Sequence, residues 1–239
     1  MTQRRRCRVV ARGALAGMLL AAALAGACGN RSDPNRPAAA GTPAPAAAPA
    51  PAATARVVVL GDSLTAGLGL SPDESYPTLL QARLRSSGLA VEIVNAGVSG
   101  DTSAGGLRRL DWSLEGPVQV LVVALGGNDG LRGLPPEELR RNLAAIIERA
   151  QSRQVTVILA GMEAPPNLGR IYTSAFRKVY RDLADQFHVA LLPFLLDGVA
   201  GVGSLNQADG IHPNPDGARK VADNLWPLVE AAVRHALTP

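Results

Sequence analysis

Four short segments of the sequence carry polar side chains that together could perform acyl transfer. They are residues 61–64 (Gly-Asp-Ser-Leu), 98–102, 126–130 and 209–213. The hydroxyl of Ser63 is a poor nucleophile unless a base removes its proton, and the imidazole of His212 could be that base. Asp209 precedes this histidine by three residues, so a turn would let its carboxylate orient the ring and stabilise the imidazolium. The residue types therefore predict a triad of Ser63, His212 and Asp209.

Acyl transfer also needs hydrogen-bond donors where the carbonyl oxygen becomes an anion, and removing one such donor lowers the rate by about 10²–10³. Two residues in the polar segments could supply donors. Gly100 has no side chain to shield its amide N–H, and Asn128 carries a side-chain NH₂ that stays neutral at every pH. We expect both to face the hydroxyl of Ser63.

Each segment also has a structural interpretation when it is considered alone. Asn128 lies in Gly-Asn-Asp-Gly, which is a strong turn former, and Asp209 could cap a helix that starts near Pro215. The other two histidines are expected to be structural or exposed, because His188 precedes a predicted strand and His235 lies in the last turn of a predicted helix. A catalytic interpretation requires a fold that brings the four segments together.

Short apolar runs alternate with helical patterns from residue 56 onward. Runs of Val, Ile and Leu without polar alternation are typical of strands buried on both faces, as in parallel sheets. They occupy residues 57–60, 91–94, 118–125, 155–160 and 189–192. Apolar side chains also recur at helical spacing, in three sets: Leu139, Leu143, Ile146, Ile147 and Ala150; Phe176, Tyr180, Leu183 and Phe187; and Val221, Leu225, Leu228, Val229 and Ala232.

This alternation predicts a three-layer αβα fold of the α/β class, with a parallel sheet of about five strands and right-handed crossovers. The expected strand order is 2-1-3-4-5, as in flavodoxin-like folds. That order places the carboxyl ends of the first three strands side by side, where such folds bind ligands. All four polar segments follow predicted strands, so this fold would gather them at one edge of the sheet.

The distribution of charge argues against a nucleic-acid-binding protein. The 239 residues include 24 Lys and Arg and 20 Asp and Glu, but five of the arginines lie within the first 12 residues. From residue 28 onward the chain has 19 basic and 20 acidic residues. With 3% aromatic residues, it has neither a basic stripe nor platforms on which bases could stack. No nucleic-acid partner is expected.

The first 27 residues have the pattern of a signal peptide. Arginine-rich residues 1–12 precede an uncharged run at 13–27, which is shorter than the ~20 apolar residues of a membrane-spanning helix. Residues 24–28 (Leu-Ala-Gly-Ala-Cys) resemble a bacterial lipobox, although Ala25 stands where that pattern usually has Leu. We expect an exported cell-envelope protein anchored through lipidated Cys28, and plain cleavage after Ala27 is the alternative.

Residues 28–55 contain six prolines and many alanines. Such a segment buries too little apolar area to offset its ordering entropy, so we expect an extended linker. Residues 56–239 are then long enough for one domain. Because the only cysteines are Cys7 and Cys28, this domain can have no disulfide, no thiol nucleophile and no cysteine metal site.

The four polar segments match, in order, the sequence blocks of the GDSL or SGNH hydrolases. The sequence resembles this family over residues 56–235, and most closely its bacterial branch of thioesterase I, lysophospholipase and arylesterase. Further stretches similar to that branch are residues 95–110, 128–135, 166–169, 192–194 and 209–214. The Gly-x-Ser-x-Gly motif of α/β-hydrolases does not occur in the sequence.

The resemblance implies a serine esterase that hydrolyses acyl esters and thioesters of small molecules or lipids through an acyl-serine intermediate. It implies that Ser63 is the nucleophile, that His212 is the general base and then the acid, and that Asp209 orients the imidazole. The oxyanion hole would consist of the amides of Ser63 and Gly100 and the side chain of Asn128. The resemblance implies no metal and no cofactor.

Two positions depart from the usual pattern of this branch: Gly97, where Ser is common, and Leu68, at a site that is often aromatic. Both bear on packing or on the shape of the acyl pocket. We expect acyl contacts from residues 161–171 and 197–208. Two alternatives stay open: an O-acetylesterase or acyltransferase acting on envelope polysaccharide, and a noncatalytic binding module.

Overall fold

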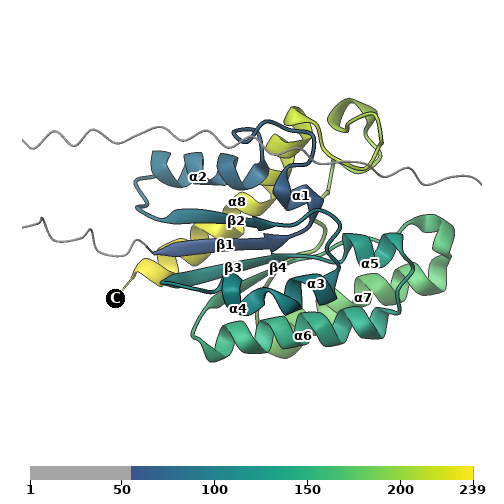
Figure 1. Ribbon diagram of the computed structural model, residues 1–239, viewed down its shortest axis with the longest axis horizontal. Coiled ribbons are helices and arrows are strands. Elements are labelled where there is room, and N and C mark those ends of the chain that lie inside the picture. Colours follow the sequence, from purple (N-terminus) through teal and green to yellow (C-terminus); the bar gives the residue numbers. More distant parts are fainter. Residues whose placement is uncertain (1–54, 239) are drawn as a thin grey trace, which may run out of the picture. The chain divides into compact units, whose positions relative to one another are not determined.

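A five-stranded parallel sheet lies at the centre of the described part of the chain, residues 55–238 of this computed structural model (Figure 1). The strands are β1 (Arg56–Gly61), β2 (Glu92–Gly97), β3 (Val118–Ala124), β4 (Thr156–Ala160) and β5 (Ala190–Leu192). Their order is β2-β1-β3-β4-β5, and every neighbouring pair is parallel. The predicted fold class and strand order are confirmed.

Helices cover both faces of the sheet. They are α1 (Ser63–Ala66), α2 (Tyr76–Ser86), α3 (Ser103–Arg108), α4 (Leu110–Ser113), α5 (Gly127–Leu131), α6 (Pro136–Ser152), α7 (Arg170–Phe187) and α8 (Pro215–Leu237), with short 3₁₀ helices η1 (Pro166–Leu168) and η2 (Gly203–Leu205). Helices α2 and α8 pack on one face, and α3, α4, α6 and α7 pack on the other (Figure 1). This arrangement gives the three predicted layers.

Burial differs between the central and the outer strands. Six of the seven residues of β3 are buried, and Val120 to Val123 have no exposed surface, which explains the unbroken apolar run in the sequence. The outer strands are only partly buried and also differ from the prediction. Strand β2 begins at Glu92 rather than at Val91, and β5 contains three residues rather than four. Each has a partner on one side only, so its sequence pattern is less strongly constrained.

The predicted helices begin and pack as their sequences require. Pro136 and Pro215 occupy the first positions of α6 and α8, where the missing N–H has no intrahelical partner to lose. The apolar residues predicted for α6 (Leu139, Leu143, Ile146, Ile147 and Ala150) are all buried. Helices α6 and α7 pack against each other and against β4, and α8 crosses β3, β4 and β5 on the opposite face. These contacts hold the sheet between its two helical layers, and the polar segments lie at one edge of this sheet.

Gly97, at the end of β2, lies unusually close to α1. A Cβ at this position would lie 2.2 Å from the backbone nitrogen of Ala66 and 2.7 Å from the carbonyl carbon of Thr65. Backbone atoms cannot move aside as the end of a flexible side chain can, so this chain has no room for the serine that is common here. The missing side chain of Gly97 thus allows the backbone of α1 to pack directly on the end of β2.

Substituting Gly97→Ala should lower the free energy of unfolding by about 1–3 kcal/mol, because the new methyl group overpacks against α1. The midpoint of urea denaturation at constant slope would measure the change. Gly203→Ala is the matched control, since a Cβ there would meet no atom within 4 Å. Equal stabilities of the two variants would contradict the close approach of β2 and α1.

Candidate active site

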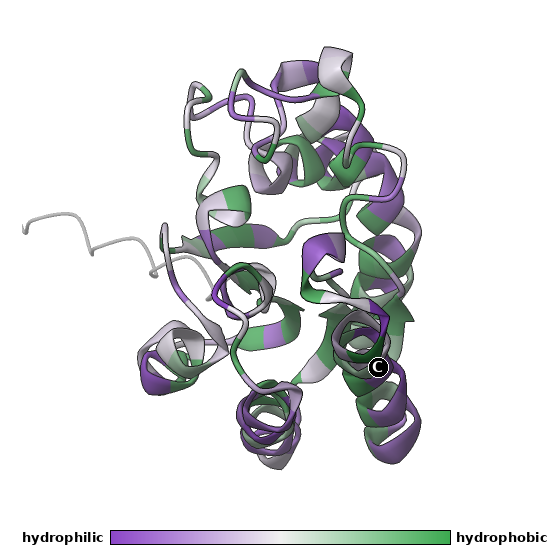
Figure 2. Cartoon of the chain, turned by 90° about the vertical axis from the view of Figure 1, so that its right-hand side faces the viewer, coloured by the Kyte–Doolittle hydropathy of each residue, from purple (hydrophilic) through white to green (hydrophobic). Residues whose placement is uncertain are grey.

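A cavity of about 680 Å³ opens at the carboxyl ends of β1, β2 and β3. This edge of the sheet faces the viewer in Figure 2. Ser63, Gly100, Asn128 and His212 all line the cavity. Most other lining side chains are apolar: Leu64, Leu68, Leu131, Met162, Ala164, Pro165, Pro166, Phe194, Leu196, Ala200 and Ile211. The volume lies within the ~300–1,000 Å³ that is usual for small-molecule sites.

The hydroxyl, imidazole and carboxylate named from the sequence form a continuous chain of contacts. Oγ of Ser63 lies 2.9 Å from Nε2 of His212, and Nδ1 of the same ring lies 2.6 Å from Oδ2 of Asp209. Ser63 is the first residue of α1, whereas His212 lies 149 residues later in the loop before α8. In this geometry the ring can take the hydroxyl proton at Nε2 while the carboxylate holds the N–H at Nδ1.

A tight turn holds Asp209 and His212 in place. Oδ1 of Asp209 accepts the backbone N–H groups of Ile211 and His212, at 2.9 and 3.0 Å. The N–H of His212, then its ring, and then the N–H of Ile211 lower the pKa of Asp209 to about 2, so this carboxylate is charged at neutral pH. The helix-capping role considered above for Asp209 belongs to Asn214, whose side chain accepts the N–H of Gly217 at the start of α8.

Gln207 fastens the histidine loop to the serine side of the cavity. Its side-chain nitrogen donates to the carbonyl oxygens of Leu68, at 2.7 Å, and of Pro213, at 2.9 Å. Its backbone N–H donates to the carbonyl oxygen of His212 at 2.7 Å. The sequence analysis did not identify Gln207, because a single glutamine in a loop has no pattern that distinguishes it.

Two backbone amides at the cavity are available to bind an anion. Within residues 55–238, the N–H groups of Ser63 and Gly100 donate to no other protein group. Gly100 has φ +84°, in the left-handed region that favours glycine, and its carbonyl oxygen accepts the Arg132 guanidinium at 2.9 Å. The Arg132 contact therefore holds the carbonyl group of Gly100, while its N–H has no protein partner among residues 55–238.

The side chain of Asn128 is oriented by two acceptors. Its Nδ2 lies 2.9 Å from the carbonyl oxygen of Asp101 and 3.3 Å from Oδ2 of Asp62. An NH₂ group has two hydrogens, so both are engaged. A substrate oxyanion would compete for the hydrogen in the longer contact, the one to Asp62, while the bond to Asp101 keeps the amide in place.

Asp62 is a buried carboxylate next to Ser63, and the sequence alone indicated no role for it. It is 2% exposed, and its Oδ1 caps α1 by accepting the N–H of Leu64 at 3.0 Å. Burial raises the pKa of Asp62 from 3.8 to about 6, against the opposing effects of Leu64, His212 and Asn128. The surroundings of Asp62 and Asp209 thus shift their pKa values in opposite directions, although both carboxylates lie near His212.

Comparison with known proteins identifies the family. Residues 59–220 match the GDSL-like lipase/acylhydrolase family. The chain belongs to this family. Its relatives are named as esterases, so the protein is an enzyme that hydrolyses ester bonds.

Three relatives show how far the similarity extends. The chain is 45% identical to Esterase TesA of Pseudomonas aeruginosa over 175 residues, which cover 73% of this chain and 87% of the relative. It is 38% identical to thioesterase 1/protease 1/lysophospholipase L1 of Escherichia coli, over 75% of this chain and 85% of the relative. It is 37% identical to an arylesterase of Vibrio mimicus, over 70% of this chain and 84% of the relative.

Solved structures agree with the fold of this GDSL-family enzyme. The crystal structure of TesA superposes with a TM-score of 0.72 at 44% identity, covering 75% of this chain and 99% of that one. The esterase EstA from Pseudoalteromonas, in a structure inhibited by monoethylphosphonate, superposes with a TM-score of 0.71 at 31% identity, covering 75% of this chain and 98% of that one.

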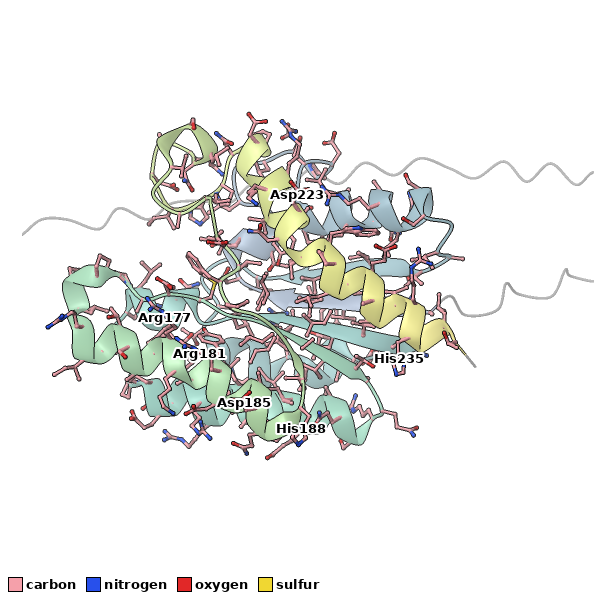
Figure 3. All side chains as sticks on the ribbon, turned by 180° about the vertical axis from the view of Figure 1, so that it is seen from behind. Arg177, Arg181, Asp185, His188, Asp223 and His235 are labelled. Carbon is pink, nitrogen blue, oxygen red and sulfur yellow. The ribbon has the colours of Figure 1, made fainter. Side chains whose placement is uncertain are left out.

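The other two histidines of the enzyme lie away from the cavity. Figure 3 shows His188 at the end of α7 and His235 near the end of α8, both at the opposite edge of the sheet. His188 has φ +52° and ends α7 in a left-handed conformation. Neither residue lines the cavity, in agreement with the structural or exposed positions expected for them.

The two segments expected to contact an acyl chain line the cavity only in part. Within residues 161–171 a consecutive stretch lines the cavity (Met162, Glu163, Ala164, Pro165 and Pro166), but within 197–208 only Ala200 does so. Phe194 and Leu196, which follow β5, and Leu131 at the end of α5 supply lining that the sequence analysis did not assign. Leu68, the departure noted above, is 48% exposed and lies at the cavity wall.

From residue 55 to 238, no group of three or more His, Cys, Asp or Glu side chains could hold a metal ion. No helix in that same range is both long and apolar enough to cross a membrane. Cys28 and the predicted signal peptide lie outside the described residues.

The buried charge of Asp62 predicts a pH-dependent stability. Because its pKa is about 6 in the folded protein and 3.8 in a free side chain, the folded state binds more protons between pH 4 and 6, and its stability falls as the pH rises through that range. Asp62→Asn removes the charge and keeps a side chain that can cap α1. Urea denaturation should show this variant gaining roughly 1–3 kcal/mol relative to wild type between pH 4 and pH 7.

A difference between the two proteins that stays constant from pH 4 to pH 7 would contradict the raised pKa. A variant that is already unfolded at pH 4 would show instead that the contact of Asp62 with Asn128 holds the loops together.

Proposed function

We propose that the enzyme hydrolyses acyl esters and thioesters through an acyl-Ser63 intermediate, with His212 as the base and Asp209 as its orienting partner. The observation that carries this proposal is the continuous contact from Ser63 Oγ through both ring nitrogens to Asp209, beside unpaired backbone amides. The amides of Ser63 and Gly100 and the side chain of Asn128 would bind the oxyanion.

The first half of the reaction acylates the serine. Nε2 of His212 takes the proton of Ser63 Oγ as this oxygen attacks the acyl carbonyl carbon. The negative charge moves to the carbonyl oxygen, where the three donors stabilise it. The imidazolium, held by Asp209, then gives its proton to the departing alcohol or thiol, and the carbonyl re-forms as the acyl-serine.

The second half repeats these steps with water. The neutral ring of His212 accepts a proton from a water molecule that attacks the acyl-serine, and the same donors bind the second oxyanion. The imidazolium returns the proton to Ser63 Oγ as the carboxylic acid leaves. Both halves use protein groups alone, and the proposal includes no metal ion or cofactor.

Acyl esters and thioesters of small molecules or lipids are the proposed substrates. The names of the relatives support this choice, because they include an esterase, a thioesterase/lysophospholipase and an arylesterase. The lining of the cavity also favours an acyl chain, since Leu, Met, Ala, Pro, Phe and Ile side chains surround the serine. A sugar acceptor, which the polysaccharide alternative requires, would find few hydrogen-bonding side chains on these walls.

The triad predicts a steep loss of activity on substitution. Ser63→Ala should lower kcat for a chromogenic short-chain acyl ester by about 10⁴–10⁶-fold, and Asp209→Asn should cost less, because Asp209 acts through the ring and forms no bond to the substrate. Ser152→Ala, on an exposed side chain at the end of α6, is the control with unchanged rate. Wild-type turnover by Ser63→Ala would refute the proposed mechanism.

A fluorophosphonate probe tests the noncatalytic alternative directly. Labelling of wild type at Ser63 and its absence in Ser63→Ala would support an activated serine, whereas an unlabelled wild type would favour a binding module. Activity confined to acetyl groups on sugars would favour the polysaccharide alternative. A preference for longer acyl chains would favour the proposed substrates.

We also propose that residues 1–27 are an export signal, that residues 28–55 link the catalytic domain (residues 56–239) to the envelope, and that Cys28 carries a lipid anchor. The arginine-rich start, the apolar run and the lipobox-like residues 24–28 support this proposal. Mass spectrometry of the mature N-terminus should find an acylated Cys28, and Cys28→Ser should release the enzyme from membranes. An unmodified N-terminal Cys28 would support plain secretion instead.

A further inference from the structure

Arg109, next to the carboxyl ends of β1 and β2, donates hydrogen bonds from all three of its guanidinium nitrogens. Nε donates to Oδ2 of Asp101 at 2.7 Å, Nη1 to the carbonyl oxygen of Ala96 at 2.7 Å, and Nη2 to the carbonyl oxygen of Gly61 at 2.8 Å. Its side chain is only 17% exposed, and that of Asp101 is 18% exposed. Of the ion pairs among the described residues, Arg109 and Asp101 form the one least exposed to solvent.

The three acceptors belong to the segments that carry the catalytic groups. Gly61 is the last residue of β1 and is followed by Asp62 and Ser63. Ala96 lies one residue before the end of β2, at the start of the loop that reaches Gly100. The side chain of Arg109 therefore joins the segment that carries Ser63 to the loop that carries Gly100.

Asp101 extends this connection to the third donor. Its carboxylate binds Arg109, while its backbone carbonyl oxygen accepts the Nδ2 of Asn128 at 2.9 Å. Asp101 is thus held by the Arg109 guanidinium at its side chain and by the Asn128 amide at its backbone carbonyl. Moving Asp101 would displace two of the three proposed oxyanion donors together.

The guanidinium of Arg109 is suited to holding several groups in fixed positions, which is a different role from supplying charge to the cavity. Its planar fork presents N–H groups on three nitrogens in fixed directions, whereas the compact ammonium of a lysine carries its donors on one nitrogen and does not reproduce that spacing. The Asp101 carboxylate balances its charge, so the pair adds little net field at the cavity. Geometry is what Arg109 contributes.

We infer that Arg109 is a positioning residue for acyl transfer, acting through Asp101 to set the Gly100 and Asn128 donors relative to Ser63. This inference rests on the proposed function of those groups. Misplacement of reacting groups by about 1 Å can cost about 10²-fold in rate, and loss of one oxyanion donor about 10²–10³-fold. Removing Arg109 should therefore slow the chemical step while leaving the acyl-binding walls of the cavity unchanged.

The test compares Arg109→Ala and Arg109→Lys with the matched control Arg140→Ala. Arg140 also binds a carboxylate, Asp182, but it lies on α6 outside the cavity lining. With a soluble short-chain ester, both Arg109 variants should lose about 10–100-fold in kcat with KM within about twofold. Their affinity for a boronic acid, which forms a tetrahedral adduct with the serine, should fall by a factor similar to that in kcat/KM.

Titration of active serines with a fluorophosphonate separates positioning from folding. Each rate is divided by the number of sites that react to completion, so an unfolded fraction does not count. Guanidinium chloride at a low concentration, compared with sodium chloride, should partly restore kcat of Arg109→Ala by occupying the vacated position. Arg109→Lys, which keeps the charge and not the fork, should stay slow.

Two outcomes would overturn the inference. A wild-type kcat per titrated site would show that Arg109 only stabilises the fold, and a rise in KM without a change in kcat would place it in substrate binding. Failure of the proposed function gives a different result, because wild type and Arg140→Ala would then show no hydrolysis that depends on Ser63.

Discussion

In the sheet, Gly61 pairs with Gly97 of β2 on one side and with Ala124 of β3 on the other, so the three strands end at the same level. The chain leaves each strand within a few residues of a group that faces the cavity: Ser63, Gly100 or Asn128. A slip of one residue would move a strand by about 3.3 Å, more than the length of a hydrogen bond. The register of these strands is therefore the constraint on which the site depends.

Two carboxylates near His212 show how the fold sets the properties of identical side chains. Asp209 is exposed and accepts two backbone N–H groups and the ring, and its pKa falls to about 2. Asp62 is buried, and its pKa rises to about 6. A buried charge lowers stability, yet Asp62 caps α1 and holds the Asn128 amide. Asp62 thus combines a cost in stability with a contribution to the geometry of the site.

The fold could be predicted from the sequence, and so could the meeting of Ser63, Gly100, Asn128 and His212 at one cavity. Buried parallel strands need unbroken apolar runs, and polar segments at their carboxyl ends must then meet at one edge. Gln207, Asp62 and Arg109 could not be assigned in this way. Their partners (Leu68, Asn128 and Gly61) are distant in sequence, and most are backbone oxygens that leave no trace in residue type. The cavity walls after β5 were missed because their loop conformations have no periodic signal.

The separation of 149 residues between Ser63 and His212 has a consequence during synthesis of the protein. A ribosome therefore adds Ser63 long before His212, and both groups exist only once the chain has passed residue 212. No shorter nascent chain contains both groups, so none can cleave an ester by this route. Under the proposed mechanism, the chain therefore stays inactive until residue 212 has been made.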